Sequence, residues 1–355
     1  MVISLILLFF ACMSLSFIED QLRYKDKLFF YGVFGVAMIF IAGMREVGST
    51  PDTESYDMYF NAKSDLTLIL MEPSFRIIID FLHSHSLGIN SLFFAYAIIS
   101  IPIHLSLFWK VSKAPLLTLT IYISYYYMMH EMVQIRAGVA AGLLLWAIYF
   151  YVKKKKLWTF AFILLGVFFH YSAAAGFVIF LFSDKLPNWQ RIVLYAVVPI
   201  GMVVYFSHID LSSILPDELG GLKLMKYRES NEKGLDDELA GWKFEANILI
   251  WMNIVLYYAS IYYHDFLKEH FKYTTIAIKM QAVGFCFLFF ANGFSKVLGN
   301  RMNDYFSIVS ILLWTASIYA FYPKLLSKVL SNAISTFRFA TSMAAYALAL
   351  LWMNK

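Results

Sequence analysis

The sequence predicts an all-α polytopic membrane protein with about twelve transmembrane helices, within a range of about 11 to 13. Of its 355 residues, 60% are hydrophobic and only 15% are charged, and the mean hydropathy is +0.64. Soluble domains are about 25% charged, so this composition excludes an ordinary soluble domain. Apolar runs long enough to cross a bilayer recur along the whole chain. We therefore expect a single integral membrane domain over residues 1–355.

Each expected span is a mostly apolar run that ends where charge, Pro or Gly interrupts it. The runs cover residues 1–18, 28–44, 91–109, 115–130, 134–152, 157–170, 172–183, 192–207, 246–263, 275–294, 305–322 and 333–352. The sixth and seventh runs are short, so His170-Tyr171-Ser172 marks either an outer turn or a break between two half-length helices. The first run has neither a basic n-region nor a small-residue cleavage site, which favours a retained helix over a signal peptide.

Basic residues predict the orientation of these spans. If the spans alternate, one set of short loops carries fifteen lysines and arginines, whereas the opposite, longer set carries twelve. Because cytoplasmic loops are enriched in Lys and Arg, the short loops are predicted to be cytoplasmic and both termini periplasmic. The net charge of +5 therefore reflects membrane orientation, and we expect no nucleic acid partner. Cys12 and Cys286 lie inside apolar runs, so we expect neither a disulfide nor a metal site from them.

Two long segments lie on the predicted periplasmic side. The first, residues 45–90, begins with turn-forming residues and continues into EPSFRIIIDFLHSH. Glu72-Pro73 is typical of a helix start. The apolar side chains that then fall on one helical face are Phe75, Ile78, Ile79 and Leu82. We expect an amphipathic helix that lies in the membrane interface.

The second long segment, residues 208–245, is acidic. It carries nine Asp and Glu residues against five Lys and Arg residues, and Gly220-Gly221 and Gly234 favour a mobile loop. Loops of this length are usually either functional or disordered. Both a substrate-covering lid and a solvated linker fit this composition, and its carboxylates could bind a cation.

Three arginines, Arg45, Arg136 and Arg301, stand at the ends of apolar runs on the predicted periplasmic side, where basic residues are normally scarce. A guanidinium stays charged, and its fork of donors matches phosphate oxygens, so several together suit a diphosphate. A single arginine at a helix end most often snorkels to lipid headgroups or pairs with a nearby carboxylate. Glu46 or Asp52 offers such a partner to Arg45, and Asp304 offers one to Arg301. The diphosphate hypothesis therefore depends on all three sharing one face.

Short motifs follow one another along nearly the whole chain. They are Gly43-Met44-Arg45-Glu46-Val47-Gly48, then Asp52 and Tyr56, Glu72-Pro73, Gln134-Ile135-Arg136-Ala137-Gly138-Val139-Ala140, Phe168-Phe169-His170-Tyr171-Ser172, and Arg301 with Tyr305-Phe306. In order and spacing this pattern resembles the EpsG-like branch of Wzy-type polysaccharide polymerases. One departure is that Ser49-Thr50-Pro51 intervenes before Asp52, whereas family members usually have Asp soon after the Gly.

The resemblance implies a glycosyltransferase similar to the GT-C class, in the bacterial inner membrane with its active site facing the periplasm. Such polymerases transfer a growing glycan from undecaprenyl diphosphate to the non-reducing end of a lipid-linked repeat unit, forming O-antigen or a similar polysaccharide. The implied partners are the lipid-linked donor and acceptor oligosaccharides, membrane lipids and a chain-length regulator. No cofactor is expected, and the sequence has no Gly-rich nucleotide loop.

That reaction requires cations and a base. Negative charge develops on the leaving diphosphate, and Arg45, Arg136 and Arg301 are the candidates to stabilise it. The acceptor hydroxyl must lose a proton, for which His170 is the first candidate. The alternatives for the base are Glu72, Asp52, Glu131 and His130, and further substrate contacts are expected from Tyr56, Arg76, His130, Gln134 and Tyr305. With arginines as the cations, we expect no divalent metal.

Three other functions stay open. An outer-face ligase that passes the finished glycan to lipid A core needs the same chemistry and differs in its acceptor. A transporter or flippase for a lipid-linked glycan would place charges at mid-bilayer and use broken or repeated helices, whereas the charges considered above gather at one face. A purely structural membrane partner is the remaining alternative.

Overall fold

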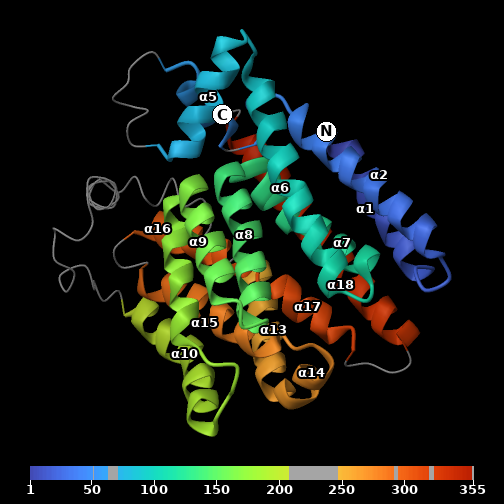
Figure 1. Ribbon diagram of the computed structural model, residues 1–355, viewed down its shortest axis with the longest axis vertical. Coiled ribbons are helices and arrows are strands. Elements are labelled where there is room, and N and C mark those ends of the chain that lie inside the picture. Colours follow the sequence, from blue (N-terminus) through green and yellow to red (C-terminus); the bar gives the residue numbers. More distant parts are fainter. Residues whose placement is uncertain (51, 63–70, 208–246, 292–294, 320–323, 354–355) are drawn as a thin grey trace. The chain divides into compact units, whose positions relative to one another are not determined.

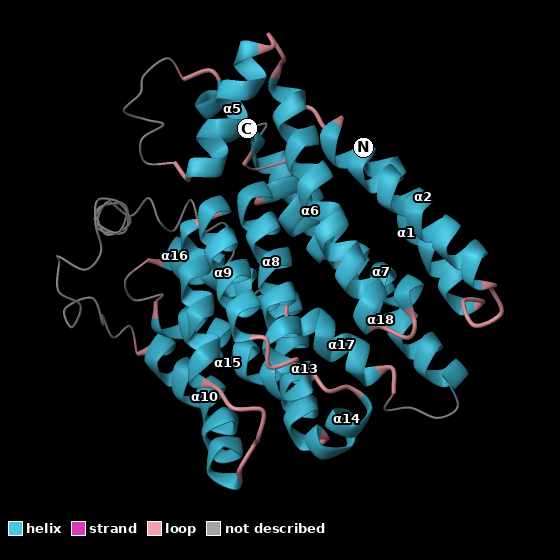
Figure 2. Ribbon diagram, viewed as in Figure 1, coloured by secondary structure: helices cyan, strands magenta, loops and turns pink. Residues whose placement is uncertain are grey.

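The computed structural model describes residues 1–50, 52–62, 71–207, 247–291, 295–319 and 324–353. Within these ranges the chain folds into helices and contains no strand (Figures 1 and 2). The all-α prediction is therefore confirmed for the described residues. The acidic segment 208–245 lies outside them, so its role as a lid or a linker stays a prediction.

Within the described ranges, four helices are long and apolar enough to cross a membrane by length and composition. They are α2 (Tyr24–Gly43), α6 (Ile89–Val111), α8 (Ile135–Val152) and α10 (Asn188–Phe206). The shorter apolar helices are α1 (Val2–Phe17), α7 (Pro115–Ser124), α9 (Lys156–Phe169), the 3-10 helix η2 (Tyr171–Leu181), α13 (Ile248–Tyr262) and α15 (Thr274–Phe290). The remaining helices are α3 (Thr53–Phe60), α5 (Pro73–Ser84), the π-helix η1 (Met128–Val133), α14 (His264–His270), α16 (Lys296–Ser307), α17 (Ser310–Ser317) and α18 (Lys324–Met353). These apolar helices are those of a membrane protein, while the count of twelve spans and their orientation stay predictions.

The chain divides into two compact units. The first contains Met1–Phe177 and Trp314–Lys355, and the second contains Val178–Leu313. The prediction of one domain over residues 1–355 stays a prediction.

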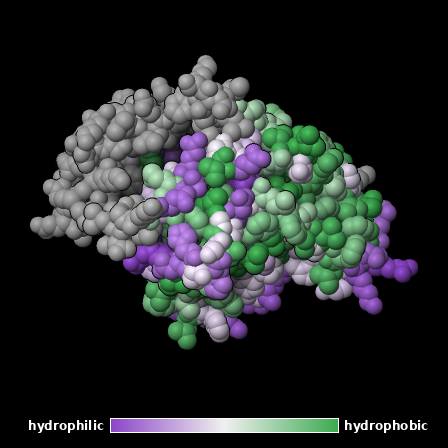
Figure 3. Space-filling model, turned by 90° about the horizontal axis from the view of Figure 1, so that it is seen from above, coloured by the Kyte–Doolittle hydropathy of each residue, from purple (hydrophilic) through white to green (hydrophobic). Residues whose placement is uncertain are grey.

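Large apolar side chains are exposed on several helices. Leu7 of α1, Phe29 of α2 and Val203 of α10 are examples. Figure 3 shows extensive hydrophobic surface, coloured green, on the face that it presents. Soluble monomers rarely expose apolar patches of more than a few hundred Å², so lipid is the natural solvent for these faces.

The expected span 115–130 is not one continuous helix. Its helix α7 ends at Ser124, and the chain then turns into η1 before α8 begins at Ile135. Gly138 makes this path possible, because a Cβ atom there would lie 2.2 Å from the backbone oxygen of His130. The sequence gives no sign of this break, because the residues around it are mostly apolar and aromatic. As a result of the break, η1 packs against α8.

The chain turns sharply at His170. Helix α9 ends at Phe169, His170 has an extended conformation, and η2 follows. The ring centroids of Phe160 and Phe177 are 5.2 Å apart, which requires η2 to return along α9. Of the two alternatives for this segment, the structure therefore shows the turn. It places His170 at the tip of a helical hairpin.

The expected span 305–322 is also interrupted. Helix α16 already begins at Lys296, where the side chain of Ser295 caps it by accepting a hydrogen bond from the Leu298 amide. It ends at Ser307, and α17 follows from Ser310. Arg301 therefore lies inside a helix rather than in a loop before a span.

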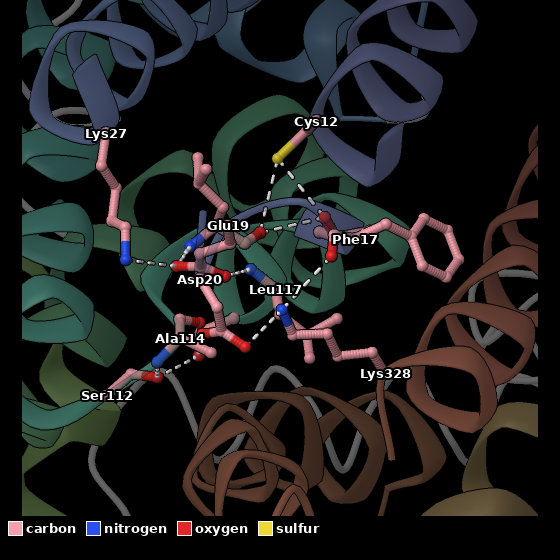
Figure 4. A network of polar contacts seen from close by, with 12 residues as sticks. Cys12, Phe17, Glu19, Asp20, Lys27, Ser112, Ala114, Leu117 and Lys328 are labelled. Carbon is pink, nitrogen blue, oxygen red and sulfur yellow. Dashed lines mark hydrogen bonds and ion pairs between the residues drawn. The ribbon is translucent and has the colours of Figure 1, made fainter. Parts of the chain in front are cut away.

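A buried carboxylate between α1 and α2 fixes the start of α7 (Figure 4). Glu19 is fully buried and accepts hydrogen bonds from the backbone amides of Leu116 (2.9 Å) and Leu117 (3.2 Å). These amides lie in the first turn of α7, where no carbonyl of the helix can accept from them and where the helix dipole favours negative charge. Beside Glu19, Lys328 of α18 forms an ion pair of 2.8 Å with Asp20. This network joins α1, α7 and α18.

Replacing Glu19 by Gln should reduce the pH dependence of stability between about pH 4.5 and 6. Burial raises the pKa of the Glu19 carboxyl from 4.5 to about 6, so the folded protein holds this proton more tightly than the unfolded chain does. The contribution of the protonated carboxyl is fully present below pH 4.5. It is lost as the pH rises through 6, by about 2 kcal/mol for a shift of this size. Thermal unfolding of the purified protein from pH 4 to 7 measures this loss.

The matched control is Glu269→Gln, which makes the same chemical change at an exposed position. It should leave the pH dependence as in the wild type. An identical slope in the wild type and in Glu19→Gln would contradict the role assigned to Glu19.

Candidate active site

A cluster of buried apolar side chains joins α3, α5, α6, α8 and the end of α9. Its members are Tyr56, Phe60, Met71, Phe75, Ile79, Leu82, Leu92, Phe93, Tyr96, Ile135, Val139, Leu143 and Phe169. The helix expected after Glu72 is present as α5, with Pro73 in its first turn. Its predicted apolar face packs into this cluster rather than against lipid, whereas Ile77 and Phe81 of α5 are exposed. Its location in the membrane interface stays a prediction.

Three residues that were predicted from separate motifs meet at the edge of this cluster. Glu72 is the N-cap residue of α5 and is fully buried. Its Oε2 atom forms an ion pair with Nη1 of Arg136, in the first turn of α8. Its Oε1 atom lies 3.1 Å from Nδ1 of His170. One buried carboxylate therefore links α5, α8 and the turn after α9.

The side chains of Arg136 and His170 remain partly accessible. They are 13% and 19% exposed, whereas the side chain of Glu72 is 0% exposed. Arg136 lies over the rings of Phe75 (5.1 Å from Cζ to the centroid) and Tyr56 (5.8 Å). Arg136 and His170 are therefore partly accessible to a ligand, whereas Glu72 contacts both of them from within the protein.

Arg45 borders the same cluster. It follows α2 and is 1% exposed, and its Cζ atom lies 3.8 Å from the centroid of the Phe93 ring. Its Nη1 donates to the backbone oxygens of Ala42 (2.6 Å) and Glu131 (3.2 Å). Among the described residues, its Nε and Nη2 have no hydrogen-bond partner. Burial lowers the pKa of Arg45 to about 10, so it remains charged at neutral pH.

Glu131 and His130, two alternative bases, are enclosed. The Glu131 carboxylate accepts hydrogen bonds from Ser100 (2.8 Å) and Tyr122 (2.5 Å) and lies 3.3 Å from Nδ1 of His104. His130 is fully buried and stacks on Tyr126, with ring centroids 6.2 Å apart. Their enclosure makes both less suited than His170 to take a proton from a substrate.

The other predicted residues take several positions. Asp52 precedes α3, Gln134 precedes α8, and Arg76 is a partly exposed residue of α5. Arg301 and Tyr305 lie on α16, in the other compact unit. Whether Arg301 approaches Arg45 and Arg136 therefore stays a prediction.

The chain matches the family model of the EpsG family over residues 27–355. It belongs to the EpsG family. This is a family of Wzy-like proteins associated with polysaccharide polymerases and glycosyltransferases. The resemblance to EpsG proteins is thus confirmed, while the assignment to the Wzy-type O-antigen polymerases stays a prediction. No curated protein and no solved structure matches the chain.

In this EpsG family member, sequence reasoning missed one buried cation. Arg338 of α18 is 1% exposed. The available signal was its position inside the expected span 333–352, because ionisable residues within membrane segments are rare and usually functional. The described residues contain no group of three or more His, Cys, Asp or Glu side chains that could hold a metal ion. Independence from metals stays a prediction.

Glu72 and Arg136 should show strong energetic coupling in this EpsG protein. Removing one partner leaves the other charge buried and unpaired, so Glu72→Gln and Arg136→Gln should each destabilise the fold by about 3 kcal/mol. In a double-mutant cycle, the coupling energy should reach about 1 to 3 kcal/mol. Thermal unfolding of the four proteins measures it.

The exposed pair Arg191 and Asp265 is the control cycle, with a separation of 3.0 Å and an Asp265 side chain that is 79% exposed. Its coupling should stay below about 1 kcal/mol. Additive effects of Glu72→Gln and Arg136→Gln would contradict the ion pair.

Proposed function

We propose that this protein is a polysaccharide polymerase that acts at the periplasmic face of the bacterial inner membrane. It transfers the growing glycan from undecaprenyl diphosphate to the non-reducing end of a lipid-linked repeat unit, as in O-antigen synthesis. The observation that carries the proposal is the contact of Glu72 with both His170 and Arg136, in a chain of the EpsG family. Through these two contacts, Glu72 holds a candidate base, His170, and a candidate cation, Arg136.

His170 is the proposed general base. Its Nδ1 faces the Glu72 carboxylate, which favours the tautomer with the proton on Nδ1. That tautomer carries a lone pair on Nε2, which takes the proton from the acceptor hydroxyl. The acceptor oxygen then bonds to the anomeric carbon of the donor sugar as the bond from that carbon to the diphosphate oxygen breaks. Glu72 stabilises the imidazolium that results.

The proposed cations stabilise the diphosphate as it leaves with the bonding electrons. Arg45 brings Nε and Nη2, which lack hydrogen-bond partners among the described residues. Arg136 engages Glu72 and the Met71 sulfur through Nη1, and a guanidinium has five N–H donors in total. Arg301 is the third proposed cation. In surroundings of low dielectric constant, fixed charges favour the transition state more than they would in water.

These fixed guanidinium charges lead us to propose catalysis without a divalent metal. Substrate contacts are proposed for Tyr56, Arg76, His130, Gln134 and Tyr305, and Asp52 remains an alternative base. A GT-C-like arrangement of about twelve spans and a chain-length regulator as partner belong to the same proposal.

Alanine substitutions should abolish long polysaccharide in a strain that lacks the native gene. His170→Ala removes the base and should slow transfer by about 10²- to 10⁴-fold. Arg45→Ala, Arg136→Ala and Arg301→Ala should each raise the barrier by about 2.7 to 4 kcal/mol, as the loss of one oxyanion-hole donor does. A gel ladder of lipopolysaccharide shows the result, and single-repeat caps distinguish a failed polymerase from a failed ligase, which leaves none.

The control is Arg23→Ala, which removes an exposed arginine on the predicted cytoplasmic side. It should leave the ladder unchanged. Long polysaccharide from all three arginine variants, at normal expression, would overturn the diphosphate part of the proposal.

A further inference from the structure

Arg338 lies deep within the longest helix that the structure describes. At the rise of an α-helix, it is about 21 Å from the first residue of α18 and about 22 Å from the last. The side chain is 1% exposed, so the guanidinium does not reach the protein surface. A different stabilising environment must therefore surround this charge.

Three aromatic rings supply part of that environment. The Cζ atom of Arg338 lies 5.0 Å from the centroid of Tyr126, 5.4 Å from that of Trp314 and 5.6 Å from that of Tyr125. Such contacts attract the cation through the ring faces but accept no in-plane N–H bonds. In the described part of the chain, Nε, Nη1 and Nη2 of Arg338 have no hydrogen-bond partner.

Two aromatic residues of the same unit also have buried nitrogen atoms that lack hydrogen-bond partners in the described part of the chain. Trp314 Nε1 and both ring nitrogens of His130 have no hydrogen-bond partner among the residues described. Trp314 faces Arg338 directly, and His130 stacks on Tyr126, one of the rings that also faces Arg338. The indole and guanidinium groups can only donate, and His130 donates through at least one nitrogen. Together they are complementary to an anion with several oxygens.

No carboxylate balances the charge of Arg338 within the described residues. Two other buried or partly buried cations of the same unit do have one, since Arg136 pairs with Glu72 and Lys328 pairs with Asp20. A buried unpaired charge is strongly unfavourable, and an apolar side chain of similar volume would avoid that penalty. The retention of a cation here is therefore best explained by an anionic ligand.

We propose that Arg338, Trp314 and His130 form an additional site for the phosphate oxygens of an isoprenoid diphosphate. The identity of this ligand rests on the proposed function. Arg338 faces Tyr125 and Tyr126, and Arg45 donates to the backbone oxygen of Glu131, so two buried guanidinium groups flank the segment 125–131. The headgroups of bulk phospholipid are a second source of phosphate oxygens, and competition with phosphatidylglycerol distinguishes them from the diphosphate.

Binding of undecaprenyl diphosphate to the full chain in nanodiscs tests this site. The wild type should bind it, and Arg338→Met, which removes the charge but keeps an apolar stem, should bind it about 10- to 100-fold more weakly, as expected for the loss of charge-assisted hydrogen bonds. Arg338→Lys should fall between them. Arg23→Met, the control for the loss of one exposed positive charge, should bind as the wild type does. Wild-type binding by Arg338→Met with an unchanged melting temperature would overturn the proposal.

Trp314→Phe provides a test that does not depend on the folding of Arg338→Met. It keeps an aromatic ring beside Arg338 and removes only the indole N–H, so binding should weaken by about 2- to 10-fold. The uncharged alcohol undecaprenol should compete poorly with the diphosphate, and phosphatidylglycerol in the nanodisc should not displace it. Unchanged binding by Trp314→Phe, equal competition by undecaprenol, or displacement by phosphatidylglycerol would each overturn the site as proposed.

This assay measures binding without an acceptor and without polymer formation. A failure of the proposed function appears as absent polymer in the wild type while binding still depends on Arg338. A failure of the present inference appears as binding that is indifferent to Arg338, whatever polymer the wild type makes.

Discussion

The buried carboxylate of Glu72 holds the candidate site together. One of its oxygens pairs with Arg136, 64 residues further along the chain, and the other faces His170, 98 residues away. Because the carboxylate is 0% exposed, water cannot replace either partner at low cost. Glu72 also stands at the N-cap of α5, so the same group that positions two reactive side chains marks the entry into the helix that completes the apolar cluster.

Three arginines of the first compact unit, Arg45, Arg136 and Arg338, fall into two kinds. Arg136 has a carboxylate partner and is partly exposed. Arg45 donates to backbone carbonyls and Arg338 lies among aromatic rings, and both are buried. Paired arginines stabilise and orient, whereas buried arginines without a carboxylate favour an incoming anion. Among these arginines, Arg45 and Arg338 are therefore better suited than Arg136 to bind a diphosphate.

Much of the helical architecture could be predicted from the sequence, because an apolar run of about 20 residues has few alternatives to a helix in a membrane. Helices α2, α6 and α8 lie close to their expected runs, and Glu72-Pro73 marked the start of α5. The break after Ser124 escaped detection because Tyr125–Tyr127 continue the apolar pattern. The contacts of Glu72 with Arg136 and His170 could not be predicted either, because their spacing in the sequence does not show which residues meet in the folded chain. Arg338 was hidden because its neighbours kept the average hydropathy of its span high.

In the proposed reaction, Glu72 and His170 act as one unit. The most direct test is the transfer rate of purified protein with lipid-linked repeat units, measured for the wild type, Glu72→Gln, His170→Ala and the double variant. Each single change should lower the rate by about 10²- to 10⁴-fold, and the double variant should be no slower than His170→Ala alone, because residues that act as a unit are not additive. A wild-type rate for Glu72→Gln, or effects that multiply in the double variant, would contradict this account.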